Sequence, residues 1–242
     1  TDAKLIGRDR FLLFMFIFVV YIAAALRLLL PWANNYLGEA GILPNNYISE
    51  SLSDFYPMIV AYMAIFTGGL LIGMVVGFIV LDEKDQNTLK AMLISPLPLK
   101  QYVLYRIGLP TVLAFIVILT MIIAINQALL PIWQLILIAA GGALTSPIAA
   151  LFFAVVAENK VAGFAYGKFV GIAGWIIAGS WFVPEPYQWL FGLFPPYWIS
   201  KAYWMAFEGR SFWWVALIIG VISQLALINL LIQRFNKVAY AT

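Results

Sequence analysis

The residues best equipped for chemistry form one polar cluster about a third of the way along the chain. Its members are Asp82, Glu83, Lys84, Asp85, Gln86, Asn87, Thr88 and Lys90. Ionisable side chains in a row could bind a metal ion or exchange protons, but the 242 residues include no His and no Cys. This composition excludes thiolate nucleophiles, metal sites with thiolate or imidazole ligands, and the usual general base near neutral pH. A site of carboxylates alone stays formally possible, and we expect neither a metal site nor a catalytic centre.

A second segment, residues 163–168, comes near to a phosphate-binding loop without being one. Such a loop needs the pattern G-x-x-x-x-G-K-[ST], in which backbone amides and Lys surround the phosphates and the hydroxyl reaches Mg²⁺. The stretch from Gly163 to Lys168 is one residue too short, and Phe169 stands where Ser or Thr is needed. We therefore expect no nucleotide-binding domain in this chain and no enzymatic activity of its own.

The composition indicates which elements must position these residues. Hydrophobic residues make up 64% of the chain and charged residues 10%, whereas soluble domains carry about 25% charged residues. A membrane-spanning helix needs about 20 mostly apolar residues. Six stretches meet this requirement: residues 11–32, 56–81, 107–130, 132–157, 161–181 and 212–233. The sequence therefore predicts an all-α polytopic membrane protein with six transmembrane helices, in a single domain over residues 1–242.

Lys and Arg residues gather on one side of this expected topology. That side receives Lys4, Arg8, Arg10, Lys84, Lys90, Lys100, Arg106, Lys160, Lys168, Arg234 and Lys237. The opposite side has only Lys201 and Arg210. By the positive-inside rule, we expect both termini in the cytoplasm. Arg27 falls inside the first span, where it either has a function or extends its charge to the headgroups.

The segment before the last span, residues 181–214, is dense in Trp, Tyr, Phe and Pro. Two short re-entrant helices in the outer leaflet, broken at Pro195-Pro196, would satisfy the backbone and fit this pattern. The alternative is an ordinary loop whose aromatic rings lie at the headgroup level.

Residues 82–97 change from polar to apolar with helical spacing. The apolar positions are Leu89, Met92 and Leu93, and Pro96, after Ser95, ends the stretch. Asp85 or Asn87 could cap a short helix here, and a second one could span residues 99–106. Such a helix either rests on the membrane surface or docks into a cytoplasmic partner.

Three stretches together resemble ABC-2-type transporter permeases. A polar start with the Thr88-Leu89 pair and an apolar run ending in Ser-Pro resembles the cytoplasmic loop after their second helix. Residues 158–163, Glu-Asn-Lys-Val-Ala-Gly, resemble a stretch of small members, including those associated with fluoroquinolone export. Residues 193–198, Leu-Phe-Pro-Pro-Tyr-Trp, resemble the element before their last helix. The chain departs from the family pattern at Asn87, often Gly, and at Ala162, typically acidic.

The resemblance implies a membrane subunit of an ABC exporter that moves a hydrophobic or amphipathic drug-, peptide- or lipid-like cargo. Two permeases, identical or related, would pair in a prokaryotic plasma membrane, in contact with lipid and not with nucleic acid. Two separate ABC ATPase subunits would bind ATP and Mg²⁺, and this chain would bind no cofactor. The implied ATPase-coupling loop contains Glu83, Lys84, Asp85, Asn87, Thr88, Leu89, Met92, Leu93, Ser95 and Pro96. The second cytoplasmic loop contributes Glu158, Asn159 and Lys160.

Two series of glycines repeat every four residues on one helix face. They are Gly69, Gly73 and Gly77 in the second span, and Gly163, Gly167 and Gly171 in the fifth. Such spacing lets another helix approach closely, either within one chain or at a seam between two permeases.

An ion-coupled secondary transporter or channel is the principal alternative function. Such a protein is expected to have an Asp or Glu embedded in the membrane, or inverted repeats, and neither is evident in the sequence. A membrane enzyme acting on lipids would lack catalytic groups.

Overall fold

In the computed structural model, residues 10–39, 52–86 and 99–241 are described, and these ranges contain helices without any strand. The elements are α2 (Arg10–Glu39), η1 (Leu52–Phe55), α3 (Tyr56–Val60), η2 (Ala61–Phe66), α4 (Thr67–Asp85), α6 (Leu99–Ile125), α7 (Ile132–Ala143), α8 (Thr145–Val156), α9 (Lys160–Ala173), α10 (Trp175–Trp181), η3 (Tyr187–Leu193), α11 (Pro195–Phe207) and α12 (Trp213–Ala241). Within the described part, six helical segments are long and apolar enough to cross a membrane. The prediction of an all-α polytopic membrane protein is confirmed.

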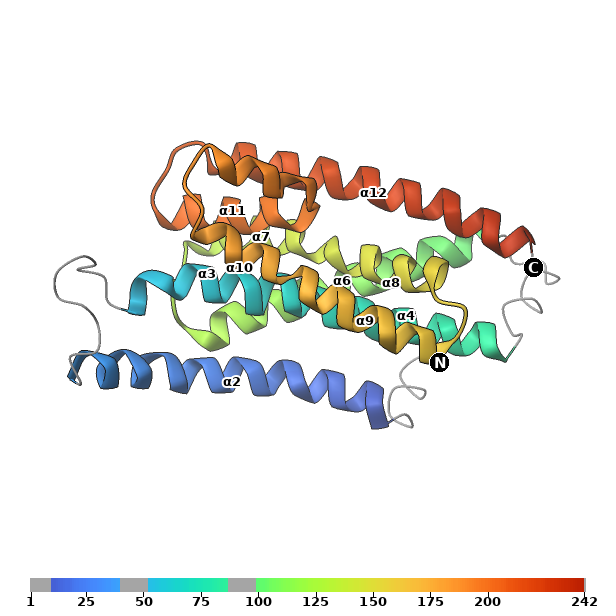
Figure 1. The fold of residues 1–242 in the computed structure, drawn as a ribbon, viewed down its shortest axis with the longest axis horizontal. Coiled ribbons are helices and arrows are strands. Elements are labelled where there is room, and N and C mark those ends of the chain that lie inside the picture. The colour runs from blue at the N-terminus through green and yellow to red at the C-terminus, as the bar shows by residue number, and fades with distance from the viewer. Residues whose placement is uncertain (1–9, 40–51, 87–98, 242) are drawn as a thin grey trace.

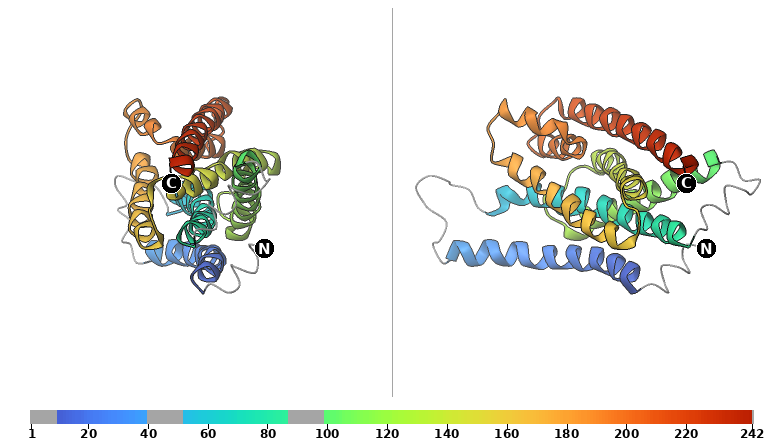
Figure 2. Two further views of the ribbon diagram at one scale, coloured as in Figure 1. Left: turned by 90° about the vertical axis from the view of Figure 1, so that its right-hand side faces the viewer. Right: turned by 45° about the vertical axis from the view of Figure 1, so that its right-hand side comes forward.

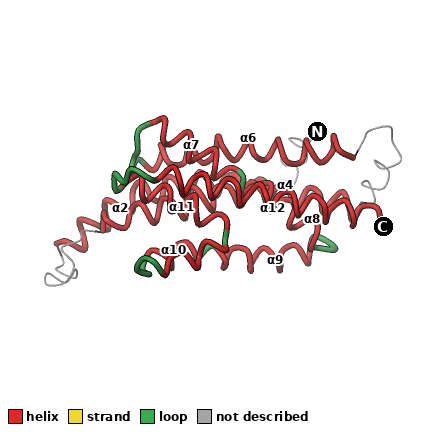
Figure 3. Tube along the Cα trace, turned by 90° about the horizontal axis from the view of Figure 1, so that it is seen from above, coloured by secondary structure: helices red, strands yellow, loops and turns green. Residues whose placement is uncertain are grey.

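The helices run along the long axis of the molecule and give it two different ends (Figure 1). We call one the basic end, where α2 begins, α4 ends, α9 begins and α12 ends. The other is the aromatic end, which contains α3, η3 and α11 (Figure 1). In Figure 3, α9 and α10 follow one side of the bundle, while α6 and α7 follow the other.

Helix α4 lies at the centre of the bundle and is the most buried of the six segments. It packs mainly on α8 and also contacts α6, α2 and α9. Helix α2 lies at the edge of the bundle (Figure 2), and most of its surface stays exposed. Since lipid tails replace water around such a bundle, each backbone polar group must find its partner inside a helix or from a side chain.

The first glycine series brings α4 against α8. A Cβ atom at Gly73 would lie 2.3 Å from the carbonyl oxygen of Ser146, and one at Gly77 would lie 3.0 Å from Cβ of Phe153. In the second series, Gly163 faces Leu81 and Gly167 faces Met74, both from α4. Gly171 has no atom within 4 Å of the position that its Cβ would take. All these close approaches are made inside one chain.

The fourth predicted span is divided into α7 and α8 at Leu144. Pro147 explains the position of the break, because its ring clashes with the carbonyl group four residues earlier, that of Ala143. A buried side chain from α12 forms hydrogen bonds with polar groups on both sides of the break. Gln224 Nε2 donates to the carbonyl of Gly141 at 3.1 Å, and Gln224 Oε1 accepts from Thr145 Oγ1 at 3.1 Å. The break therefore has a polar partner in the last span.

Three further differences from the sequence-based expectation concern the third and fifth spans. Helix α6 is continuous from Leu99, so residues 99–106 are its first turns and not a separate helix. It ends at Ile125 instead of residue 130, because Asn126 and Ala128 adopt positive φ angles of 55° and 51°. The fifth span is divided into α9 and α10 at Gly174, where a side chain would collide with the ring of Phe66.

The aromatic segment forms helices, as predicted, with a break before Pro195. The 3₁₀ helix η3 precedes the break, and α11 begins with Pro195 in its first turn, where the missing N–H costs no hydrogen bond. Tyr197 and Tyr203 of α11 are buried in the main core, and α11 packs on α12 and α7. Helix α11 is thus part of the bundle, whereas most side chains of η3 stay exposed.

Gly73→Ala is expected to destabilise the protein, because the added methyl group would force α4 away from the backbone of α8. Overpacking of this kind costs about 1–3 kcal/mol. The matched control is Gly171→Ala, which adds the same methyl group to open space and gains helix propensity. Thermal unfolding in detergent measures both variants, and equal melting temperatures would contradict the close approach at Gly73.

Candidate functional site

The last turn of α4 connects three other helices through consecutive side chains. Asp82 binds α9, Glu83 binds α6, and Lys84 binds the end of α8. Asp85 reaches the first backbone amide of α9. We call Asp82, Glu83, Lys84 and Asp85, with these partners, the interhelix clasp. It lies at the basic end of the bundle.

The most buried contact of the interhelix clasp is the ion pair between Glu83 and Arg106, whose side chains are 13% and 6% exposed. An ion pair removed from water loses hydration, so each charge depends on the presence of the other. Truncation of one partner is therefore far more costly than replacement of both. This dependence fixes the end of α4 against α6.

Lys84 caps helix α8. Its Nζ donates to the carbonyl oxygens of Ala154 at 3.2 Å and of Ala157 at 2.9 Å. The last carbonyl groups of a helix have no partner within it, and they carry partial negative charge. A cation at this position satisfies both requirements and ties α4 to α8.

The start of α9 is held by carboxylates and by its own cap. Asn159 is the N-cap, and its Oδ1 accepts from the amide of Ala162 at 2.9 Å. Lys160 Nζ donates to Asp82 at 3.1 Å, and its backbone amide lies 3.4 Å from Asp85 Oδ2. Negative charge is favourable at a helix N-terminus. The two polar segments that the sequence analysis singled out, residues 82–85 and 158–160, are thus in direct contact.

The remaining residues of the predicted coupling loop lie outside the described residues. They are Asn87, Thr88, Leu89, Met92, Leu93, Ser95 and Pro96. Glu158 is exposed beside the interhelix clasp. In the ranges that the structure describes, no three acidic side chains are placed to hold a metal ion.

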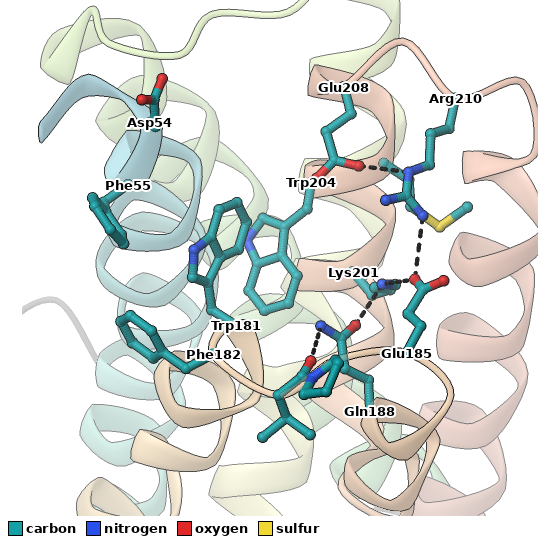
Figure 4. A pocket seen from close by; sticks show the side chains of 13 residues that line it. Asp54, Phe55, Trp181, Phe182, Glu185, Gln188, Lys201, Trp204, Glu208 and Arg210 are labelled. Atoms are coloured by element: carbon teal, nitrogen blue, oxygen red, sulfur yellow. Dashed lines mark hydrogen bonds and ion pairs between the residues drawn. The ribbon is translucent and has the colours of Figure 1, made fainter. Parts of the chain in front are cut away.

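A second site, at the aromatic end, was missed by the sequence analysis. A cavity of about 550 Å³ opens between η1, the end of α10, and α11. Its polar and charged lining residues are Asp54, Glu185, Gln188, Lys201, Glu208 and Arg210, and its aromatic ones are Phe55, Trp181, Phe182 and Trp204. In Figure 4 the two indole rings lie between Asp54 and the charged cluster around Lys201. We call this cavity the aromatic-end pocket.

Glu185 is the hub of the charges in this pocket. Its Oε1 accepts from Lys201 and, at 3.2 Å, from Arg210, while Arg210 also pairs with Glu208 (Figure 4). Lys201 also donates to Gln188. The hydrogen bond from Lys201 and the two nearby cations hold the pKa of Glu185 below its usual range, although partial burial opposes the shift. Both cations predicted for the external side thus have carboxylate partners.

Arg27 is engaged by a neighbouring helix. Its Nη1 donates to the carbonyl oxygen of Ala124 at 3.0 Å, near the C-terminal end of α6. A cation at that position donates a hydrogen bond to a terminal carbonyl group and interacts favourably with the negative end of the helix dipole. The contact ties the peripheral helix α2 to α6.

Glu83→Gln is expected to lower the free energy of unfolding by about 3 kcal/mol, since Arg106 would lose its buried counter-charge. The double variant Glu83→Leu/Arg106→Met should recover most of this loss, because it removes both charges. Glu158→Gln, at an exposed carboxylate of the same end, is the control and should have little effect. Melting temperatures that are equal for Glu83→Gln and Glu158→Gln would contradict a structural role of the pair.

Acidification should weaken the aromatic-end pocket only at low pH. Because the folded-state pKa of Glu185 is lowered, its ion pairs contribute stability above the ordinary pKa and lose it as the pH falls through the lowered value. At pH 7, Glu185→Gln should lower the melting temperature by about 1–3 °C, as expected for a largely exposed cluster. This difference from the unmodified protein should persist at pH 5.5 and shrink below pH 4, and its absence at pH 7 would contradict the assignment.

Comparisons with known proteins agree with this architecture. A family model described as "Fluoroquinolones export permease protein Rv2686c-like" matches residues 2–232. The fluoroquinolones export permease proteins Rv2686c and MT2760 of two Mycobacterium tuberculosis strains (H37Rv and CDC 1551 / Oshkosh) are each 32% identical over 192 residues, which cover 76% of this chain and 74% of theirs. No solved structure matches the chain significantly. The resemblance to permeases associated with fluoroquinolone export is therefore confirmed, and this chain belongs to the Rv2686c-like family of fluoroquinolones export permeases.

Proposed function

We propose that this chain is the membrane subunit of an ATP-driven exporter in a prokaryotic plasma membrane, with ATP hydrolysed by two separate ABC ATPase subunits. The observation that carries the proposal is the interhelix clasp. It joins α4 to α6, α8 and α9 immediately before residues 87–98, which contain most of the ATPase-coupling loop implied by the resemblance to ABC-2-type permeases. The basic end, with Lys84, Arg106 and Lys160, would face the cytoplasm in agreement with the charge bias.

The interhelix clasp suits the transmission of a displacement. A pull on residues 87–98 acts first on the end of α4 and on the start of α6, which flank them in the chain. Since Lys84 and Asp82 hold the ends of α8 and α9, these helices would follow α4 instead of separating from it. ATP binding by a partner would thereby favour one arrangement of the bundle over another, which is the requirement for coupling.

The cargo would be an amphipathic aromatic compound, as the names of the relatives suggest. The described spans offer it an apolar environment, because their Asp and Glu residues all lie near the helix ends. The same feature disfavours an ion-coupled transporter, which would need an embedded carboxylate. A second permease, identical or related, would complete the conduit, and exposed rings such as Trp32 and Tyr36 of α2 would face lipid or that partner.

The proposal is tested by purification of the chain from its native membrane in mild detergent, with mass spectrometry of the associated proteins. A stoichiometric partner that contains a P-loop, and whose ATP hydrolysis the permease stimulates, is the expected result. Recovery of the folded permease without such a partner, together with ion flux in liposomes, would overturn the proposal in favour of a channel or secondary transporter.

A charge swap tests the role of the interhelix clasp in the same complex. Asp82→Lys places two cations side by side, so we expect stimulated ATP hydrolysis to fall several-fold while basal hydrolysis by the ATPase is unchanged. Asp82→Lys/Lys160→Asp restores an ion pair of opposite polarity and should recover most of the stimulation. Failure of the double variant to recover, with normal melting temperature and normal partner binding, would show that the pair has no part in coupling.

A further inference from the structure

We propose that the aromatic-end pocket binds aromatic organic cations, in which a protonated amine is attached to a flat ring system. This assignment deepens the proposed function and rests on it for its biological role as a cargo site. The chemistry of binding itself follows from the pocket alone.

The pocket has the size and walls for a flat aromatic molecule. Its volume of about 550 Å³ falls within the range of sites that enclose drug-sized ligands. Two indoles form one wall: Trp181 and Trp204 meet edge to face with ring centroids 5.0 Å apart (Figure 4). Phe55 and Phe182, with centroids 6.0 Å apart, extend the aromatic surface. Such rings bind flat molecules and attract cations at their faces.

The charges of the pocket favour a positive ligand. Three carboxylates line it against two cations. Glu185 and Glu208 are engaged by Lys201 and Arg210, so the cations are already neutralised. Asp54 forms neither a hydrogen bond nor an ion pair with the residues that the structure describes, and it lies beside Phe55. Among the described residues, the charge without a partner at this pocket is therefore the exposed carboxylate of Asp54, at the margin of the pocket (Figure 4).

A second, independent feature indicates a ligand: a hydrogen-bond donor in the wall of the pocket has no acceptor. Trp204 lines the pocket and is only 2% exposed, yet its Nε1 donor has no hydrogen-bond partner in the described structure. A buried donor without an acceptor is unfavourable, and native structures rarely retain one without a reason. A ligand that carries an acceptor on its ring system, such as a ring carbonyl, would satisfy this N–H while its amine faces Asp54.

A smaller cavity of about 300 Å³ lies on the other side of the charged cluster. It shares Glu185, Lys201 and Arg210 with the aromatic-end pocket, and its remaining walls are apolar or aromatic, with Trp198 and Phe212 among them. The ion pairs thus separate a cavity with a free carboxylate from an apolar one. This division favours amphipathic ligands, since a cationic group and an apolar group would each find a suitable cavity.

The test measures binding to the purified permease in lipid nanodiscs, without ATP or any partner. The probes are norfloxacin, a flat ring system with a protonated piperazine amine and a carboxylate, and N-acetylnorfloxacin, which keeps the rings and the carboxylate and lacks the cation. We expect the unmodified protein to bind norfloxacin about tenfold more tightly than the acetylated probe, as a charge-assisted contact requires. Asp54→Asn should abolish this preference, because it removes the charge and retains the shape of the side chain.

Glu39→Gln is the matched control. Glu39 is an exposed carboxylate at the same end of the bundle, at the end of α2, and it does not line the pocket. This variant should keep the full preference for norfloxacin. Equal preference in Asp54→Asn and in Glu39→Gln, or no preference in the unmodified protein, would overturn the assignment of the site.

The outcomes separate this inference from the proposed function. Cation-selective binding that depends on Asp54, in a permease that recruits no ATPase, would retain the binding site and reject the ATP-driven exporter. ATP-driven transport with unaltered probe selectivity in Asp54→Asn would reject the binding site and retain the exporter.

Discussion

Close approach of α4 to α8 is the constraint on which most of the structure depends. Gly73 faces the carbonyl of Ser146 so closely that no side chain fits between them. With lipid outside, no hydrophobic force presses apolar helices together, so close packing and polar contacts must supply the attraction. Because α4 occupies the centre of the bundle, α6 and α9 both pack against it, and its position determines theirs. The charged residues at the end of α4 then hold in place the helices that its glycines allow to approach closely.

The interhelix clasp follows from the same constraint. Consecutive residues on a helix project in different directions, so Asp82, Glu83 and Lys84 reach three different neighbours only if those neighbours surround α4. A peripheral helix could not use such a row of charges. The short polar cluster, which could have been a solvated surface, thus joins four helices at one end of the bundle.

The sequence predicts the spans well because hydrophobicity and length decide them locally. It predicts one span over residues 132–157, and Pro147 explains the break near it only once the structure shows that α7 ends and α8 begins at Leu144. It does not predict that Gln224 satisfies that break, since nothing local connects residues 141 and 224. The aromatic-end pocket is hidden for the same reason: Asp54 and Lys201 are separated by most of the chain, and only the packing of α11 brings them to one cavity.

Both sites share one continuous helical segment. Residues 52–85 form a single run that carries Asp54 at one end and the interhelix clasp at the other. Its middle, Ala61–Phe66, is π-helical, a form that occurs mostly as local bulges at functional positions. There Tyr62 and Phe66 contact α10, at Trp175 and beside Gly174. The proposed coupling site and the proposed binding site therefore lie at opposite ends of one continuous helical segment, with the π-helical turn between them.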